Sequence, residues 1–276
     1  MQLGIFAKTF PRPTLEATLD AVLAHKLDCI QFNFACAGLE SLPDKIDPSL
    51  AKQIGAAVRK PGIRMAAVSG TFNMIHPDPK RRADGLRRLE AIAGSCQTIG
   101  TNLITLCTGT RDPDDMWRAH PDNDSTDAWR DLTMGMQQAI QIAERDGVFL
   151  GIEPELANVI NSAPKARRLL DDMKSPQLKI VMDAANLLHT SELPRAWAIW
   201  QEAFDLLGGD ILIAHAKDLA ADGSFVAAGR GALDYDLYLR LLQSVKFDGP
   251  LILHGLNETE VDASTWLLRD KLKNKR

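Results

Sequence analysis

Residues Gly147 to Asn158 read GVFLGIEPELAN, a short apolar run between a glycine and a proline. Such a run is typical of a strand that is buried on both faces in a parallel sheet. Pro154 has no N–H to give to a sheet ladder, so we expect the strand to stop there, with Glu153 as its last residue. A carboxylate at the lip of a core is often only a loop cap, but this position also suits a metal ligand or a base.

Three later apolar runs end in the same way. Asp183 ends the run in IVMDAAN, His215 the run in ILIAHAKD, and His254 the run in PLILHGL. Each interval between these residues has room for one helix and one strand. The four polar residues are therefore expected at the ends of consecutive strands.

Strand-like and helix-like segments alternate along the whole chain. The strand-like runs are residues 3–6, 29–34, 64–68, 103–107, 148–153, 178–182, 211–216 and 251–253, and the helix-like segments are 14–25, 51–59, 80–99, 125–145, 164–173, 196–207, 236–245 and 258–272. This alternation predicts an α/β fold, a single (β/α)8 TIM barrel domain over residues 1–276 with its active site at the C-terminal face of the strands. A doubly wound sheet would normally carry a glycine-rich loop after its first strand, where this chain has AKTFPRP.

Composition limits the classes of function. The net charge of −4 gives no reason to expect a nucleic-acid partner. The sequence shows no secretory signal pattern and no apolar run near the roughly 18 residues that a membrane span requires. The four cysteines form no C-x-x-C pair, so no zinc knuckle or redox motif is indicated. We expect a cytoplasmic protein with reduced thiols and no membrane partner.

The polar strand ends suit a divalent metal ion that binds sugar oxygens. Such an ion favours carboxylate ligands, sometimes with imidazole, and leaves positions open for substrate. Glu153, Asp183, His215 and His254 supply this mixture. A single one of them would more simply be a hydrogen-bonded polar residue, but four on consecutive strands are hard to explain by packing.

At these residues the chain resembles the xylose isomerase-like TIM barrels, specifically the sugar phosphate isomerase/epimerase group. The resemblance covers nearly the whole chain and rests on GIEPE at 151–155, MDAAN at 182–186, HAKD at 215–218, AGRGALDY at 228–235 and GPLILHG at 249–255. It implies carbohydrate metabolism and a bound Mn²⁺, Mg²⁺, Co²⁺ or Zn²⁺. The family's usual ligands are Glu, Asp, His and Glu at the ends of strands five to eight, which Glu153, Asp183 and His215 match in order.

The departure is at strand eight, where the family usually has Glu and this chain has His254. In the family's usual scheme one glutamate removes a proton next to a carbonyl and the other returns it, through a cis-enediolate. His254 then either ligates the metal while Glu153 is the sole acid/base, or itself shuttles the proton. Alternatively Glu155, Glu258 or Glu260 folds in as a replacement. We favour ligation by His254.

Other residues are candidates for substrate contact. Lys217 shares strand parity with His215 and would bind a hydroxyl, a carboxylate or a phosphate, or else form a salt bridge with Asp218 or another acid. Asn186 stands where the family often has His, and Glu155 follows Glu153 by two residues.

Three more candidates lie in loops. His76 follows the third strand and is either a substrate ligand or a surface residue. Trp117 and His120 belong to the long segment 108–124, which would form a lid wall over a sugar ring or pack only on itself.

These observations predict a divalent-metal-dependent sugar or sugar phosphate isomerase or epimerase that acts by proton transfer through an enediolate. Its partner would be a small sugar or sugar-derived molecule, and a homodimer is the default assembly. The alternatives are a metal-dependent dehydratase or other lyase on a keto-polyol or related acid, and a sugar-binding barrel without catalysis. A DNA repair enzyme of the same barrel type is disfavoured by the acidic balance.

Overall fold

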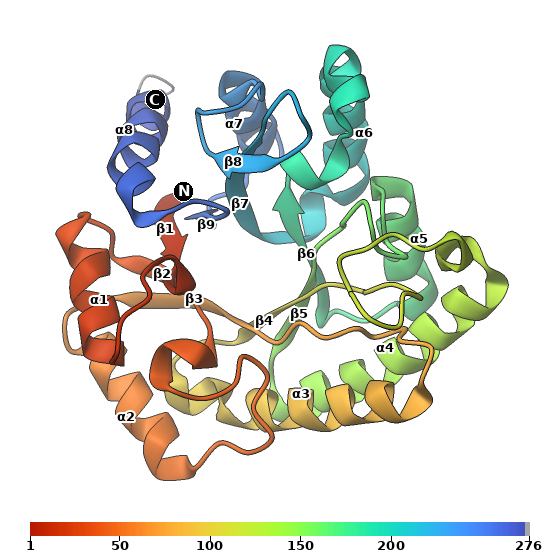
Figure 1. Ribbon diagram of the computed structural model, residues 1–276, viewed down its shortest axis with the longest axis horizontal. Helices are drawn as coiled ribbons and strands as arrows, with labels where there is room; N and C mark the ends of the chain where they lie inside the picture. Colours follow the sequence, from red (N-terminus) through yellow and green to blue (C-terminus); the bar gives the residue numbers. More distant parts are fainter. Residues whose placement is uncertain (274–276) are drawn as a thin grey trace.

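The computed structural model describes residues 1–273, and in this part of the chain eight parallel strands close into a barrel (Figure 1). The parallel strands are β1 (Gln2–Phe6), β2 (Cys29–Phe32), β3 (Arg64–Ser69), β4 (Leu103–Leu106), β5 (Phe149–Ile152), β6 (Leu178–Asp183), β7 (Ile211–Leu219) and β9 (Pro250–Leu253). Each strand pairs with the next, and β9 pairs with both β7 and β1, so the ring is complete. The short strand β8 (Phe225–Ala227) adds an antiparallel hairpin to β7.

The helices surround the barrel, as Figure 1 shows. They are α1 (Leu15–Ala24), α2 (Pro48–Arg59), α3 (Pro79–Ile99), α4 (Thr126–Asp146), α5 (Ala163–Met173), α6 (Ala196–Leu207), α7 (Tyr235–Ser244) and α8 (Val261–Lys273). Short 3-10 helices lie in the connections: η1 (Ala7–Thr9), η2 (Phe34–Ala37), η3 (Pro121–Asp124), η4 (Ala185–Leu187), η5 (Thr190–Arg195), η6 (Gly208–Asp210) and η7 (Glu258–Glu260).

Local sequence determines where the long helices begin and end. In α4, the Ser125 side chain accepts a hydrogen bond from the N–H of Ala128, which satisfies one of the free donors of the first turn. The helix ends at Gly147, whose φ of 66° is a left-handed conformation that glycine adopts without a steric penalty. The same glycine begins the connection to β5, so the helix end directly precedes the strand that carries Glu153.

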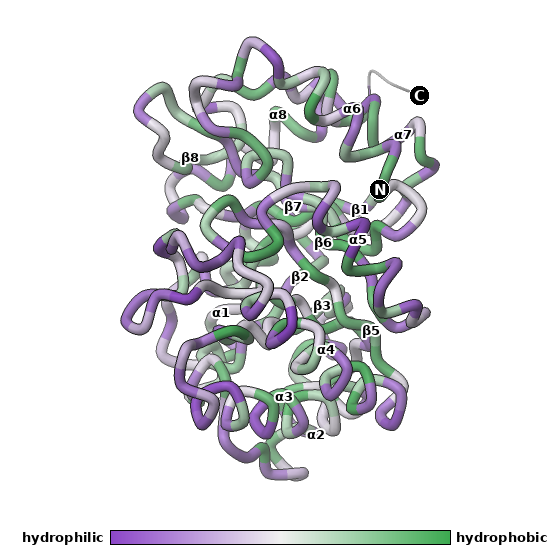
Figure 2. The backbone as a smooth tube through the Cα atoms, turned by 90° about the vertical axis from the view of Figure 1, so that its right-hand side faces the viewer, coloured by the Kyte–Doolittle hydropathy of each residue, from purple (hydrophilic) through white to green (hydrophobic). Residues whose placement is uncertain are grey.

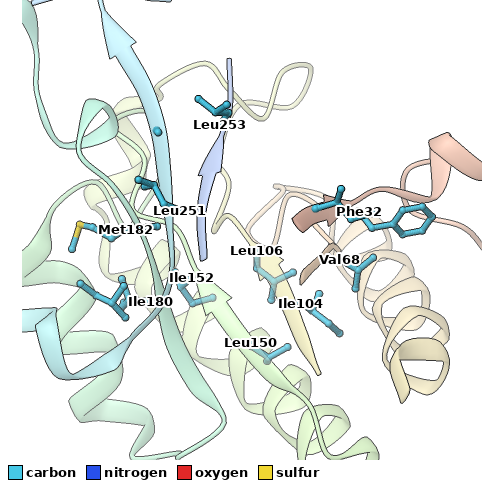
Figure 3. Packing of buried hydrophobic residues seen from close by; sticks show 14 of the residues in the cluster. Phe32, Val68, Ile104, Leu106, Leu150, Ile152, Ile180, Met182, Leu251 and Leu253 are labelled. Carbon is cyan, nitrogen blue, oxygen red and sulfur yellow. The ribbon is translucent and has the colours of Figure 1, made fainter. Parts of the chain in front are cut away.

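The core has two parts. The larger part lies between the strands and the helices, where side chains from several strands pack together (Figure 3). Hydrophobic and hydrophilic residues alternate along the chain (Figure 2). A smaller cluster of buried residues comprises Cys29, Ala66, Ala67, Leu103, Val181, Ile213 and Ile252. Alternate side chains of a strand point to the same side, so the residue two positions later continues the same surface.

Polar residues follow this smaller cluster two positions further along five strands. The pairs are Cys29 and Gln31, Leu103 and Thr105, Val181 and Asp183, Ile213 and His215, and Ile252 and His254. The apolar cluster is thus the floor of a polar layer that lies nearer the C-terminal ends of the strands. This is the end at which TIM barrels place their active sites.

The predicted barrel is confirmed, with differences at the ends of several elements, two of which concern the site. Strand β5 ends at Ile152, one residue before Glu153, although the N–H of Glu153 still donates to the Leu106 carbonyl at 2.9 Å. Strand β7 extends to Leu219 and forms the hairpin with β8, which the sequence pattern did not predict. All four cysteines are free. Among the helices of residues 1–273, none combines the length and the apolar character that crossing a bilayer requires.

Candidate active site

The polar layer brings Asp183, His215 and His254 together. Strand pairing places Asp183 beside His215 on β6 and β7, and His215 beside Ile252 on β9. One potential ligand atom from each of the three residues lies within 4.8 Å of the other two. Three consecutive parallel strands of the ring therefore present a carboxylate and two imidazoles to one point.

The orientation of His215 is determined by a chain of hydrogen bonds. Its Nε2 lies 2.8 Å from Oε1 of Gln31, and Nε2 of Gln31 donates to the Thr105 hydroxyl at 3.2 Å. The amide of Gln31 therefore presents its oxygen to the ring, so Nε2 of His215 is the donor. Nδ1 is left facing Asp183 and Glu153, as in a metal-binding histidine whose other nitrogen is held by a second residue.

Buried polar atoms without partners are concentrated here. Within residues 1–273, the side-chain atoms that are buried without a hydrogen bond are Oδ2 of Asp183, Oδ1 of Asn186, Nδ1 of His254 and Oγ1 of Thr265. Such atoms are rare because leaving them unpaired is costly, so three in one site indicate that a ligand belongs there. The carboxylate and imidazole donors fit a small divalent cation.

Ring stacking holds His254 in place. Its ring lies parallel to that of His215, with centroids 5.0 Å apart and an interplanar angle of 1°. Phe6 stacks on the His254 ring at 5.3 Å. The position of the His254 ring is therefore determined by packing between two neighbours.

Glu153 and Glu155 share one amide. Nδ2 of Asn186 donates to Oε1 of Glu153 at 2.8 Å and to Oε1 of Glu155 at 2.7 Å. Glu153 also lies 3.1 Å from Nδ1 of His215. The three side chains form one wall of the site, and Glu153 connects this wall to the cluster of Asp183, His215 and His254.

Lys217 brings a positive charge into the site. Its Nζ is 3.5 Å from Oδ2 of Asp183 and 3.9 Å from Oε1 of Glu155, and it lies 3.7 Å over the centre of the Phe225 ring. The stem of Lys217 passes Gly255, where a Cβ would lie 3.4 Å away from it. Asp218, an alternative partner from the sequence, instead accepts N–H bonds from the turn after β8.

Burial and neighbouring charges give the two imidazoles different pKa values. Burial opposes protonation of His215, but the charges of Glu153 and Asp183 outweigh it and raise the pKa of His215 to about 9. Burial, together with the neighbouring charges of His215 and Lys217, lowers the pKa of His254 to about 4. At neutral pH His254 is thus an uncharged imidazole, whereas Nδ1 of His215 would have to release a proton before it could bind a cation.

The three carboxyl groups of the site also differ in their pKa values. Burial alone would raise the pKa of all three, and for Glu155 it dominates and raises the pKa to about 8. In Glu153, the charge and hydrogen bond of His215 outweigh burial and lower the pKa. In Asp183, Lys217 and His215 bring the pKa well below its usual range. One acid and two carboxylates therefore share the site at neutral pH.

The loop candidates make other contacts. Both ring nitrogens of His76 contact backbone atoms, the Pro113 carbonyl at 3.0 Å and the Asp78 N–H at 3.0 Å, so this residue joins two loops. His120 accepts a hydrogen bond from the Asp122 N–H at the start of η3, and Trp117 is 53% exposed. Their contact with a substrate stays a prediction.

Three residues of the site were missing from the sequence interpretation. Gln31 and Thr105 orient His215, and Phe225 covers Lys217. Gln31 interrupts the apolar run CIQF, and a polar residue within a buried strand is the signal that would have indicated it. Phe225 lies on the unpredicted strand β8.

Comparisons with known proteins agree with the barrel fold. A family model described as xylose isomerase-like TIM barrel matches residues 19–270. L-ribulose-5-phosphate 3-epimerase UlaE of Escherichia coli (strain SMS-3-5 / SECEC) is 24% identical over 273 residues, which cover 94% of this chain and 89% of that protein.

Two solved structures share the fold. A D-tagatose 3-epimerase-like protein aligns with a TM-score of 0.78 at 14% identity, covering 99% of this chain and 97% of that one. An IOLI protein with a bound zinc atom aligns with a TM-score of 0.71 at 16% identity, again covering 99% and 97%.

Proposed function

Because the chain belongs to the xylose isomerase-like TIM barrel family, we propose that it is a metal-dependent sugar epimerase or isomerase. The substrate would be a small keto sugar whose proton next to the carbonyl is removed and returned. The observation that carries the proposal is the cluster of Asp183, His215 and His254 with Glu153 in contact with it. The relative UlaE, an epimerase of a sugar phosphate, supports the class of reaction.

Asp183, His215 and His254 are the residues that we propose hold the ion. When bound, a divalent ion supplies Lewis-acid polarisation of a substrate oxygen. Oδ2 of Asp183 and Nδ1 of His254, which are buried without a hydrogen bond, support this assignment. Nδ1 of His215 supports it as well, because it faces Asp183 and Glu153 while Nε2 is held by Gln31. The IOLI protein with its zinc atom shows that a barrel of this fold can hold such an ion.

Glu153 is the proposed base. It is ionised, it lies beside the cluster, and Asn186 and His215 hold its Oε1 in one position. A carboxylate held in this way takes the proton from the carbon next to the carbonyl without reorganising in the reaction. Lys217, with its ammonium beside Asp183, is placed to bind a substrate oxygen.

Proton NMR in D₂O tests the proposal. The purified protein is incubated with L-ribulose, D-tagatose and L-ribulose 5-phosphate after dialysis against EDTA, and again after addition of Mn²⁺, Mg²⁺, Co²⁺ or Zn²⁺. We expect conversion of at least one ketose, with deuterium at the reacting carbon, only when metal is present. Glu153→Gln should lower kcat/KM about 100- to 10,000-fold. The matched control Glu202→Gln, at an exposed position of α6, should retain activity.

Two results would refute the proposal. One is the absence of conversion and of deuterium exchange with every ketose and metal. The other is a Glu153→Gln variant that is as active as the unmodified protein.

A further inference from the structure

The cluster of Asp183, His215 and His254 offers two kinds of donor atom. Asp183 has a carboxylate oxygen, whereas each histidine has a ring nitrogen, and the three donors lie within 4.8 Å of one another. Mg²⁺ favours oxygen ligands and keeps several waters, so it gains little from imidazole. Zn²⁺ accepts nitrogen and oxygen donors, and its catalytic sites typically have three protein ligands and one open position. The donor set therefore bears on which ion the site takes.

Stacking, rather than a hydrogen bond at Nδ1, positions the ring of His254. The ring lies between Phe6, at a centroid distance of 5.3 Å, and His215, at 5.0 Å. Its Nδ1 is buried and has no hydrogen bond to the described part of the chain. Because an unpaired buried nitrogen destabilises a fold, this nitrogen indicates a ligand that belongs at the site.

The surroundings of residue 254 suit a flat aromatic ring. The Phe6 ring stacks on His254 at an interplanar angle of 19°, and the His215 ring is parallel to it within 1°. A carboxylate between these rings would meet the face of Phe6, where the ring quadrupole is negative. Phe6 and His215 therefore support an imidazole at this strand end, and with it a nitrogen donor.

The charge of Lys217 acts alike on every divalent ion. Its Nζ lies 3.5 Å from Oδ2 of Asp183, so it repels any cation that binds to this carboxylate. Mg²⁺, Mn²⁺, Co²⁺ and Zn²⁺ carry the same charge, so this repulsion does not distinguish them. Selection among these ions must come from the bonds that each forms with the donor atoms.

We propose that the site selects Zn²⁺ or Co²⁺ over Mg²⁺ and Mn²⁺, and that the nitrogen donor of His254 is a cause of this preference. The inference rests on the metal site of the proposed function but not on sugar turnover. Imidazole suits the later ions of the first transition row, whereas Mg²⁺ and Mn²⁺ suit oxygen ligands. Replacing this nitrogen by an oxygen should therefore bring the affinities for Zn²⁺ and Mn²⁺ closer together.

Competition with a chromophoric chelator measures the dissociation constants of Zn²⁺ and Mn²⁺ for the full chain after dialysis against EDTA, at one fixed pH. We expect the ratio of the Mn²⁺ constant to the Zn²⁺ constant to fall at least about tenfold in His254→Glu. His254→Gln removes the nitrogen without adding a charge and should lower the ratio as well. The control His189→Glu, at an exposed position after β6, should leave the ratio unchanged.

A second measurement uses the unmodified protein, so it holds even if circular dichroism shows that the variants do not fold. The histidines are labelled with ¹⁵N, and their ring signals are followed by NMR as metal is added to the metal-free protein. One equivalent of Zn²⁺ should shift the ring signals of two of the six histidines. One equivalent of Mg²⁺ should leave all of them in place.

The inference is overturned if either folded variant of His254 keeps the ratio within about threefold of normal. A fall in His254→Glu alone would show that the added charge, and not the donor atom, sets the preference. The inference is also overturned if Mg²⁺ shifts the same two histidine signals as Zn²⁺. If neither ion binds, the metal site fails and the proposed function fails with it. If Zn²⁺ is selected but no ketose is converted, only the proposed function fails.

Discussion

Replacing Lys217 by methionine tests the electrostatic balance of the site. The Lys217 ammonium is 3.5 Å from Oδ2 of Asp183, a distance at which two unit charges attract by about 5 kcal/mol at an effective dielectric constant of about 20. Both groups are buried, and removing one partner of a buried pair typically costs about 3–5 kcal/mol because the other charge is left uncompensated. We therefore expect metal-free Lys217→Met to lose about 3–5 kcal/mol of unfolding free energy.

Urea denaturation in EDTA, followed by tryptophan fluorescence, measures this loss. Lys179→Met is a matched control, because Lys179 pairs with Asp210 at 2.9 Å but both side chains are partly exposed, and such pairs contribute about 0–1 kcal/mol. Mn²⁺ should restore more stability to Lys217→Met than to the unmodified protein, because the ion takes over the compensation of Asp183. The reasoning is refuted if the two methionine variants lose the same free energy, or if Mn²⁺ stabilises Lys217→Met no more than the unmodified protein.

Three further predictions concern the surroundings of this lysine and the loops. In EDTA, the pKa values of about 9 for His215 and about 8 for Glu155 in the folded protein lie above the ordinary values of 6.5 and 4.5, so both groups stabilise less as pH rises. The melting temperature should fall between about pH 6.5 and 9, and His215→Asn should flatten the fall; a flat profile in the unmodified protein would contradict this. Phe225→Ala should cost about 1–2 kcal/mol in urea through loss of its contact with the Lys217 ammonium, whereas Phe225→Tyr should not; equal losses would argue against that contact. Asn158→Ala leaves the buried N–H of Gly109 unpaired, so it should cost about 1–3 kcal/mol and speed hydrogen exchange in residues 108–118; unchanged exchange there would show that Asn158 does not hold the loop.

The fold was predictable because its signals are local. Each strand is a short apolar run, and Gly147 and Pro154 mark the boundaries of β5. The sequence also showed directly that a polar residue stands at the end of several of these apolar runs. In a parallel barrel the strand ends share one face, which is why Asp183, His215 and His254 could be expected together.

The rest of the site depends on contacts between distant residues. Gln31 orients His215 across most of the chain, and nothing in the run CIQF indicates which residue it meets. Phe225 reaches Lys217 because a three-residue strand folds back along β7, and a strand this short has no detectable period. Glu155 was visible as a candidate, but its shared bond with Asn186 required the loop geometry.

The central claim is that one divalent ion is held by Asp183, His215 and His254. A crystal grown with Zn²⁺ and measured at the zinc absorption edge tests it directly. We expect an anomalous peak at about 2.0–2.2 Å from a carboxylate oxygen of Asp183 and one ring nitrogen of each histidine. A peak bound by other residues, or no peak in the barrel, would contradict it.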